Sequence, residues 1–267
     1  MMIEDDGIHI IILGTGTSTG IPVIGCSCPV CLSDDPRDKR LRCSCYVKAQ
    51  GVDLIIDVGP DFRAQAIRAG IANVDAVLIT HHHFDHVVGL DDLRPFLFEN
   101  RTAIPCYTSP NSAEVLDRMF AYIFRDGTYP GTPNLELKAV EESFQVASRD
   151  DERKKTTVIP VPVEHGDFLI YGYRIGNFAY LTDTSGVPDE SVSLLQDLDV
   201  LVLDALRHRP HSKHLTISQA VEVAQQIGAR QTYFIHMAHS VLHADEDAKL
   251  PDGVAFAYDG LSFSVGA

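Results

Sequence analysis

The chain has 267 residues, of which 45% are hydrophobic and 22% are charged, as in an ordinary globular protein. Asp and Glu outnumber Lys and Arg by 37 to 22, so the formal net charge is −15. This balance argues against a protein that binds a long nucleic acid, because such binding rests on many Lys and Arg contacts. The length is sufficient for a large hydrophobic core, and we expect residues 1–267 to form a single domain.

The sequence also bears on the compartment in which the protein works. No apolar run approaches the roughly 20 residues that a membrane-spanning helix needs. The segment Met1–Gly7 is acidic and lacks the basic and apolar parts of a signal peptide. We therefore expect a cytoplasmic protein without a membrane partner. In that compartment its six cysteines are expected to be thiols or metal ligands rather than disulfides.

The N-terminal part predicts a strand followed by loops rich in glycine and cysteine. The strand is expected at Ile8–Leu13, and the glycine-rich connection Gly14–Gly20 follows it. This connection lacks the lysine and the glycine spacing of a nucleotide-binding loop, although its backbone could approach a ligand closely. Farther along, Cys43 and Cys45 are expected to be core thiols. Three earlier cysteines within six residues form a compact set of thiolate donors, namely Cys26, Cys28 and Cys31.

The rest of the chain alternates predicted strands with predicted helices. Strands are expected at Tyr46–Gln50, Val52–Val58, Val74–Ile79, Ile104–Thr108, Thr156–Val163, Phe168–Ile175, Asn177–Leu181, Val200–Leu203, Thr232–Ile235, near Val254 and near Leu261. Helices are expected at Phe62–Ala69, within Gly89–Phe98, from Asn111 to about Phe124, at Pro188–Leu195 and at Ile217–Ile227. Arg125–Asn134 is predicted to be a loop, and Val140–Lys155 a mixture of strand and charged hairpin.

The segment His81–His86 follows one of the predicted strands and is rich in metal-ligand residues. Because side chains alternate along an extended chain, His81 and His83 are expected to point the same way. If the chain then turns into a helix, Asp85 and His86 can reach a second point close by. Four such ligands can serve two adjacent ions, and imidazole with carboxylate suits zinc, manganese or iron. The alternative, a surface histidine cluster, fits less well with a position at the end of a strand.

Three more potential ligands stand where predicted strands end, namely His165, Asp183 and His236. Each of them alone could be a core or capping residue. Their recurrence at strand ends predicts that they converge with the histidine segment on one site.

The segment His81–His86 resembles the HxHxDH signature of the metallo-β-lactamase superfamily, whose members are mostly dinuclear metallohydrolases. The resemblance implies an α/β (α+β) protein with the four-layer αββα sandwich of the metallo-β-lactamase fold. It also implies two divalent ions in the active site, zinc or manganese, that hold a bridging hydroxide. The first ion would be bound by His81, His83 and His165, and the second by Asp85, His86 and His236, with Asp183 bridging both.

The same resemblance bears on the reaction. Asp183 marks the phosphodiesterase-like side of the superfamily, because the β-lactamases proper typically have Cys there. His214 stands before a predicted helix in a His-x-Thr context that resembles the superfamily's phosphodiesterases. It would donate to a phosphate oxygen or protonate the leaving alkoxide, although His208 and His211 could compete for this role. We therefore expect Asp85 and His214 to be catalytic residues.

A narrower resemblance covers nearly the whole chain. The three motifs Gly14-x-Gly16, Gly25–Cys31 and Cys43–Ser44 together resemble the cyclic-phosphate phosphodiesterases of phosphonate breakdown. This implies that the substrate is a small phosphodiester or nucleotide, with a cyclic phosphate of ribose or of a nucleoside expected, and that hydrolysis yields a phosphomonoester. It further implies a structural zinc ion bound by Cys26, Cys28, Cys31 and His239.

Other functions stay open at this point. A tRNA 3′-processing nuclease belongs to the same superfamily, but it needs a basic path for its substrate, which the acidic chain does not suggest. A cofactor-biosynthesis protein, of the kind that makes pyrroloquinoline quinone, shares the cysteine insert. A thioester or lactam hydrolase and a non-catalytic binding protein are further alternatives. The sequence leaves the formation of a homodimer open.

Overall fold

The computed structural model describes residues 7–98, 102–125 and 131–266. The acidic N-terminus up to residue 6 and part of the loop predicted at Arg125–Asn134 lie outside these ranges. Within them, no helix combines the length and the apolar character that crossing a membrane requires.

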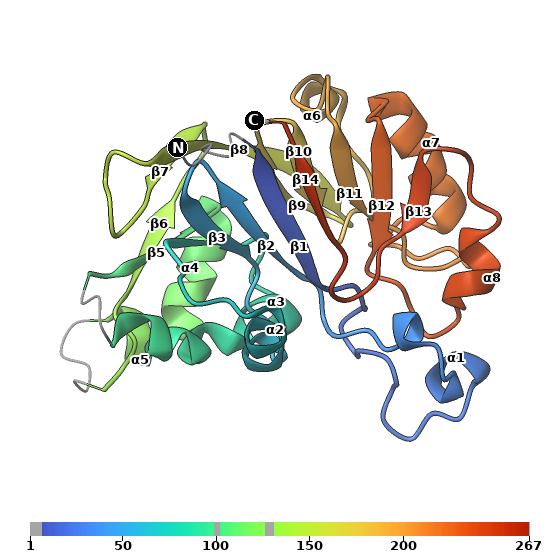
Figure 1. Cartoon of the computed structure of the whole chain (residues 1–267), viewed down its shortest axis with the longest axis horizontal. Helices are drawn as coiled ribbons and strands as arrows, with labels where there is room; N and C mark the ends of the chain where they lie inside the picture. The colour runs from blue at the N-terminus through green and yellow to red at the C-terminus, as the bar shows by residue number, and fades with distance from the viewer. Residues whose placement is uncertain (1–6, 99–101, 126–130, 267) are drawn as a thin grey trace, which may run out of the picture.

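The described strands form two mixed sheets of seven strands each (Figure 1). The order in the first sheet is β14 (Ser262–Val265), β1 (Ile8–Gly14), β2 (Ser44–Ala49), β3 (Val52–Ile56), β4 (Ala76–Leu78), β5 (Ile104–Thr108) and β6 (Leu135–Ala139). The order in the second is β13 (Val254–Phe256), β12 (Gln231–Ile235), β11 (Val200–Asp204), β10 (Phe178–Leu181), β9 (Phe168–Ile175), β8 (Lys155–His165) and β7 (Phe144–Ala147).

Helices lie along the outer faces of both sheets. The α-helices are α1 (Pro29–Leu32), α2 (Phe62–Ala69), α3 (Phe84–Val87), α4 (Pro110–Met119), α5 (Ala121–Phe124), α6 (Asp189–Ser193), α7 (Ile217–Ile227) and α8 (His243–Asp247). Two 3₁₀ helices are η1 (Pro36–Asp38) and η2 (Val88–Leu97). Helices α2, α4 and α5 together with η2 pack against the first sheet, and α7 packs against the second. The expected four-layer αββα sandwich is therefore confirmed.

The main core lies between the two sheets. Because side chains alternate along a strand, every second residue of β1 and β2, such as Ile10 and Val47, faces the other sheet. There they meet Tyr173, Phe178 and Tyr180 of β9 and β10, all fully buried. Each buried aromatic or branched side chain stabilises the fold by about 1.5–3 kcal/mol relative to an exposed one. The two sheets are therefore held as one body, and residues at their ends keep fixed positions.

The parallel strands of both sheets determine where a site can form. Strands β3 to β6 run parallel, as do β10 to β13, so each run ends at one edge of its sheet. At this edge three residues other than glycine have a left-handed backbone, with φ of 61° at Asp57, 54° at Asp183 and 62° at His236. Such conformations are costly for these residues and concentrate at functional sites. Gln50 and Asp197 have similar φ angles in turns at the opposite end of the sheets, so the backbone supports a functional edge at the strand ends only together with the side chains there.

Most predicted elements occur within a residue or two of their expected bounds, but one helix differs. The helix expected from Asn111 begins earlier, because Ser109 caps it with its side chain and Pro110 occupies the first helical position. It is also interrupted at Phe120, whose φ of −113° and ψ of 39° are not helical. Strand β6 and the short helices α1 and α8 were not predicted.

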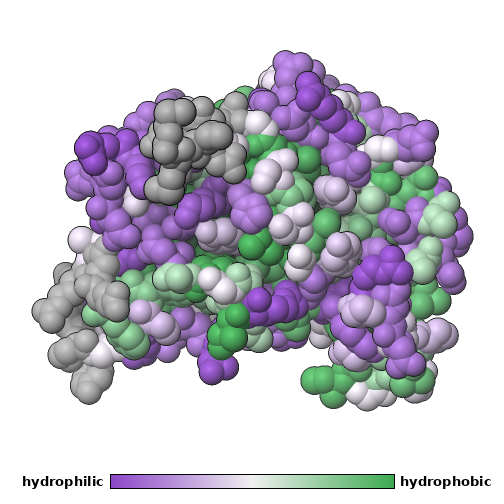
Figure 2. Space-filling view, viewed as in Figure 1, coloured by the Kyte–Doolittle hydropathy of each residue, from purple (hydrophilic) through white to green (hydrophobic). Residues whose placement is uncertain are grey.

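Helix α1 belongs to a loop that projects from the strand edge of the second sheet, at the lower right of Figure 1. Figure 2 shows hydrophobic atoms at the tip of this region on an otherwise mainly hydrophilic rim. Among the residues concerned, Ile24 is fully exposed and Leu32 is mostly exposed. The loop is therefore anchored by its other residues, which include the cysteine set.

Candidate metal centre

The structure brings all seven predicted active-site ligands together at the strand edge. They form two groups that share Asp183, and within each group the ligand atoms lie within 4.8 Å of one another. The first group is His81, His83, His165 and Asp183, and the second is Asp85, His86, Asp183 and His236. The two sheets both contribute, because the segment His81–His86 follows β4 and the other ligands come from the ends of β8, β10 and β12.

The turn into helix α3 sets the direction of the side chains of Asp85 and His86. Helix α3 starts at Phe84, as predicted, and its backbone approaches the loop after β3 very closely. A Cβ atom on Gly59 would lie 2.0 Å from the carbonyl oxygen of Asp85, so only glycine fits there. This close approach holds Asp85 and His86 against the end of β3.

The hydrogen bonds of His165 leave one ring nitrogen ready for a metal. Its Nδ1 donates to the carbonyl oxygens of Asp183, at 2.7 Å, and of Lys213, at 3.1 Å. Its Nε2 is buried and has no protein partner. Burial lowers the pKa of His165 to about 4, so the ring is neutral and Nε2 carries a free lone pair. That is the state in which histidine binds a metal.

His86 and His236 each have a carboxylate beside Nδ1, as a hydrogen bond in His86 and as an ion-pair contact in His236. The Nδ1 of His86 lies 2.7 Å from Asp57, and the Nδ1 of His236 lies 3.2 Å from Asp204. The Nε2 of His86 then faces two further carboxylates, Asp85 at 3.2 Å and Asp183 at 3.1 Å.

This crowding of carboxylates around buried imidazoles is a strongly negative environment. Although burial opposes it, Asp183, Asp57 and Asp85 raise the pKa of His86 well above its ordinary value. Likewise, against the cost of burial, His236 and His86 hold the pKa of Asp183 well below its ordinary value. The donors therefore fit divalent cations, which satisfy imidazole and carboxylate lone pairs together.

Asp57 and Asp204 were not singled out in the sequence, yet each orients a ligand. Asp57 also accepts hydrogen bonds from the backbone N–H and the hydroxyl of Thr80, both at 2.8 Å, which fixes its position behind His86. Their positions in the sequence could have identified them, because Asp57 follows β3 and Asp204 ends β11, just as the ligands stand at the ends of other strands. Outer partners of this kind set the ring orientation and basicity of metal-binding histidines.

His214 lies next to the second ligand group. Its Nδ1 is 3.2 Å from Asp204, and its ring stacks on that of His236 with centroids 4.7 Å apart. Of the competing histidines, His208 is ion-paired with Glu246 at 2.7 Å, which turns it away from this role. The ring of His211 lies 5.0 Å from that of His214. His214 is thus the histidine that shares a carboxylate with a predicted ligand.

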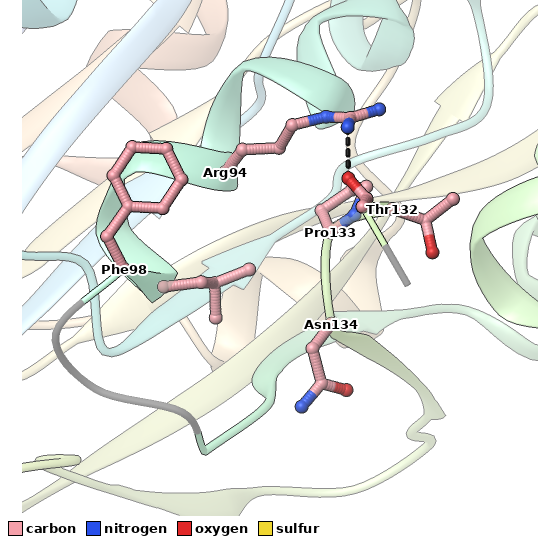
Figure 3. A pocket seen from close by; sticks show the side chains of 7 residues that line it. Arg94, Phe98, Thr132, Pro133 and Asn134 are labelled. Carbon is pink, nitrogen blue, oxygen red and sulfur yellow. Dashed lines mark hydrogen bonds between the residues drawn. The ribbon is translucent and has the colours of Figure 1, made fainter. Parts of the chain in front are cut away.

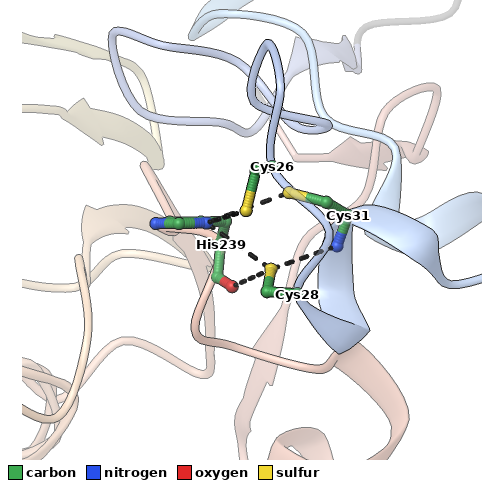
Figure 4. Close-up of side chains that lie close together, drawn as sticks. All are labelled: Cys26, Cys28, Cys31 and His239. Atoms are coloured by element: carbon green, nitrogen blue, oxygen red, sulfur yellow. Dashed lines mark hydrogen bonds between the residues drawn. The ribbon is translucent and has the colours of Figure 1, made fainter.

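The predicted cysteine set gathers around one histidine (Figure 4). The Nδ1 of His239 lies 3.3 Å from the sulfur of Cys26, 3.5 Å from that of Cys28 and 3.8 Å from that of Cys31. The pKa of Cys28 is lowered to about 6, chiefly because its sulfur accepts a hydrogen bond from the backbone N–H of Cys31. Three sulfurs and one imidazole nitrogen within 4.8 Å of one another match the donors of a tetrahedral zinc site.

A buried ion pair holds the two parts of this cysteine–histidine cluster together. The side chain of Arg40 is fully buried and lies 2.9 Å from Asp38. It also donates to the carbonyl oxygens of Ala238, at 3.4 Å, and Val241, at 2.7 Å. Because these carbonyls flank His239, the ion pair ties that segment to the loop that follows the cysteines.

Another hollow lies beside η2, away from the predicted ligands (Figure 3). It has a volume of about 250 Å³ and is lined by Arg94, Leu97, Phe98, Gly131, Thr132, Pro133 and Asn134. Arg94, the charged residue among these, is ion-paired with Asp91 at 2.6 Å and donates to the carbonyl of Gly131. Among the described residues that line the pocket, none therefore offers a free charge to a ligand.

Two facing sheets between helical layers, with imidazoles and carboxylates gathered at their strand ends, define a metal-dependent hydrolase of the metallo-β-lactamase fold. A sequence model of the beta-lactamase superfamily domain matches residues 53–237. The crystal structure of a new diphosphatase from the PhnP family is 42% identical, with a TM-score of 0.89 and 97% of both chains covered. The chain therefore belongs to the metallo-β-lactamase superfamily and is PhnP-like.

Two curated relatives are similar to this chain in sequence. An octanoyltransferase of Porphyromonas gingivalis is 42% identical over 94% of this chain, which spans only half of that protein's length. The coenzyme PQQ synthesis protein B of Methylorubrum populi is 28% identical, with 73% of this chain and 72% of that protein covered. The name octanoyltransferase belongs to a protein of which the part that matches this chain is only about half.

Proposed function

We propose that this chain is a dinuclear metal-dependent phosphodiesterase that hydrolyses small phosphodiesters, with cyclic phosphates of ribose or nucleosides as the preferred class, to phosphomonoesters. The observation that carries the proposal is the pair of ligand groups sharing Asp183, with His214 and Asp204 beside the second group. The similarity to a protein described as a diphosphatase supports phosphate chemistry.

Each residue of the centre has a role in this proposal. His81, His83 and His165 would hold one divalent ion, Asp85, His86 and His236 the other, and Asp183 would contact both. Zinc and manganese both suit this set of nitrogen and oxygen donors. Two such ions would supply positive charge to a phosphodiester and would make water a nucleophile at neutral pH.

His214 would act on the substrate and not on a metal. Asp204 accepts from Nδ1 and so fixes the orientation of the ring. In the proposed role, Nε2 would donate a proton to a phosphate oxygen or to the leaving alkoxide. Asp204 also holds His236, so it couples the position of the proton donor to that of a ligand.

We further propose that Cys26, Cys28, Cys31 and His239 bind a structural zinc ion. A Cys₃His set fills all four tetrahedral positions and leaves none for a substrate or water. Its contribution would be to join the N-terminal loop to the segment after β12, next to His236.

A substrate screen tests the proposed function. The purified chain, loaded separately with zinc and with manganese, is assayed on bis-p-nitrophenyl phosphate, 2′,3′-cyclic nucleotides, a precursor tRNA, a β-lactam and a thioester. We expect turnover of the first two substrates and little cleavage of the tRNA, because the chain is strongly acidic. Turnover of the lactam or the thioester without any phosphodiesterase activity would reject the proposal, and efficient tRNA cleavage would favour the nuclease.

A further inference from the structure

The hairpin that carries His165 places an aromatic ring directly against the first ligand group. Strands β8 and β9 are joined by the two-residue turn at Gly166 and Asp167, in which Gly166 has a φ of 65°. The register of the hairpin pairs His165 with Phe168, and the side chains of such cross-strand pairs lie side by side. The two ring centroids are 5.2 Å apart at an interplanar angle of 84°. Phe168 therefore meets the imidazole of His165 edge to face, an arrangement that aromatic pairs prefer.

The same phenylalanine also contacts His83, another predicted ligand of the first group. Its ring centroid lies 6.2 Å from that of His83, with the two ring planes 86° apart. His82 adds a third ring, which stacks on Phe168 at 6.4 Å and meets His83 at 5.8 Å. The Nδ1 of His82 is held 3.1 Å from the hydroxyl of Ser112 in α4. Packed rings from both sheets therefore restrict how the imidazole of His83 can turn.

His83 differs from the other four imidazole ligands in how its ring is held. The Nδ1 atoms of those four each face a polar partner, namely the hydroxyl of Thr80, the carbonyl of Asp183, and the carboxylates of Asp57 and Asp204. The Nδ1 of His83 instead lies 2.8 Å from Nε2 of His81, and within the described residues its ring makes no second hydrogen bond. Because metal-binding histidines are normally oriented by an outer partner, ring packing takes over that task for His83.

A lysine holds the ring of Phe168 in turn. The ammonium group of Lys213 lies 5.3 Å from the centre of this ring, a cation–π contact. A Cβ atom added to Gly166 would lie 3.0 Å from the Cγ of Lys213, so the lysine stem packs closely on the turn. The carbonyl oxygen of Lys213 also accepts from the Nδ1 of His165. One residue thus contacts both members of the cross-strand pair, His165 through its backbone and Phe168 through its side chain.

We propose that Phe168 is a positioning residue, which fixes the rings of His83 and His165 and thereby sets the metal affinity of the first ligand group. Phe168 has no donor atom for a metal, and it acts by keeping two imidazoles in the orientation in which their lone pairs converge. The inference rests on the two metal sites of the proposed function but not on the reaction, because binding is measured without turnover. The second group does not share this dependence, since carboxylates lie beside the Nδ1 atoms of His86 and His236.

The test measures metal binding by each ligand group separately. After mild chelation, which leaves only tightly held zinc, the protein is titrated with manganese(II), and free manganese is followed by electron paramagnetic resonance. Manganese suits imidazole and carboxylate donors rather than thiolates. His236→Ala leaves every donor of the first group in place, and His165→Ala leaves every donor of the second.

The expected result is a loss of affinity in one group only. In the His236→Ala background, Phe168→Leu and Phe168→Met should each weaken manganese binding by about tenfold or more, the range for losing an outer partner of a ligand. In the His165→Ala background, the same two changes should alter manganese binding by less than about twofold, because they touch no residue of the second group. In the chain that keeps all seven ligands, both variants should lose one of two ions at limiting metal.

Two controls separate positioning from a general loss of packing. Phe168→Tyr keeps the ring and should restore manganese affinity to within about twofold of the parent. Phe263→Leu removes a partly buried ring of β14 that packs on Tyr233 and Phe178, and it should leave both groups unchanged. Thermal melts verify that each variant is folded.

The possible outcomes separate this proposal from the proposed reaction. Equal weakening in both backgrounds, no weakening in either, or a loss in Phe168→Tyr as large as in Phe168→Leu would overturn the role of Phe168. A chain with all seven ligands that binds no manganese would reject the paired metal sites and this role together. Selective weakening of the first group in a protein without phosphodiesterase activity would support the role of Phe168 while rejecting the proposed reaction.

Discussion

At the residue scale, Asp183 combines an unusual backbone conformation with burial and with a place in both ligand groups. Its backbone is left-handed, its side chain is buried, and its carboxylate belongs to both ligand groups. Its hydroxyl partner, Thr182, donates to it at 2.8 Å and helps to fix the carboxylate. The strained backbone is maintained because the surrounding sheets leave the side chain no other place.

Replacing this carboxylate tests the dinuclear proposal directly. Asp183→Ala should lower the metal content below two ions per chain and abolish hydrolysis, because one residue serves both groups. Elemental analysis and a phosphodiester assay measure the two effects, and circular dichroism checks the fold. Asp189→Ala, at an exposed position in α6, is the control and should behave as wild type. Full activity of Asp183→Ala with two bound ions would contradict the bridging role.

His214 allows a proton donor to be distinguished from a metal ligand. His214→Ala should reduce kcat by about 10²–10⁴-fold, the range for a lost general acid, with unchanged metal content. A substrate that releases p-nitrophenolate should suffer less, since its leaving group needs no proton. His208→Ala, which removes an exposed ring paired with Glu246, serves as the control. Equal losses for good and poor leaving groups would assign His214 to positioning alone.

At the scale of elements, the predicted zinc ion would join the cysteine loop to the segment after β12, which Arg40 also contacts. Cys28→Ser should lose one tightly bound zinc and lower the melting temperature, with a smaller effect on kcat, because the set lies outside the ligand groups of the centre. Zinc content after mild chelation and a thermal melt are the measurements. Ser27→Ala, an exposed neighbour, should change neither. A protein that never holds more than two ions, with Cys28→Ser melting like wild type, would exclude the structural site.

The turn before β14 contains a carboxylate that should make stability depend on pH. Burial raises the pKa of Asp259 to about 6, although it accepts hydrogen bonds from Thr15, at 2.8 Å, and from the backbone N–H of Leu41, at 2.9 Å. Since the unfolded value is about 3.9, the native state binds the proton more tightly. Its contribution is fully present below about pH 4 and is lost as the pH rises through 6.

Asp259→Asn should therefore flatten part of this dependence. Urea unfolding of both proteins at pH 4.5 and pH 7.5 gives the free energies of unfolding. Between these two pH values, the difference in free energy of unfolding between wild type and variant should change by about 2 kcal/mol, with wild type gaining at the lower pH. Parallel pH dependence in the two proteins would show that Asp259 does not titrate as its burial implies.

The elements also indicate what could be predicted from sequence and what could not. Ligands at strand ends were predictable, because alternation and strand order bring such residues to one edge. Their partners were not, since Asp57 and His86, or Asp204 and His236, meet only through tertiary packing. Similarly, the composition of the charged segment Asp34–Arg42 is typical of a loop, and nothing local indicates that Arg40 becomes fully buried.

At the scale of the whole molecule, each active-site ligand group joins the two sheets. The histidine segment comes from the first sheet, and His165, Asp183 and His236 come from the second. An ion bound in either group therefore connects the two halves of the sandwich, and its removal leaves carboxylates such as Asp85 and Asp183 with only the neighbouring imidazoles to offset their charge. Ligands that bind only the folded state stabilise it by mass action.

Metal removal should consequently destabilise the entire fold. Free metal at a thousand times its Kd corresponds to about 4 kcal/mol for one site, so exhaustive chelation should clearly lower the melting temperature. Differential scanning calorimetry before and after chelation, and again after zinc is restored, measures the effect. The Asp183→Ala protein should respond less to the same treatment. An unchanged melting temperature after verified removal of all ions would argue against ligands shared between the sheets.

The last donors of both proposed metal sites, His236 and His239, lie close together near the C-terminal end of the described chain. During synthesis on the ribosome, the cysteines and the histidine segment emerge long before these two residues. Before residues 236 and 239 are made, the cysteine set and the second active-site group each lack one donor. The Cys₃His set and the second active-site group can therefore be completed only after synthesis has passed residue 239, in the segment that follows β12.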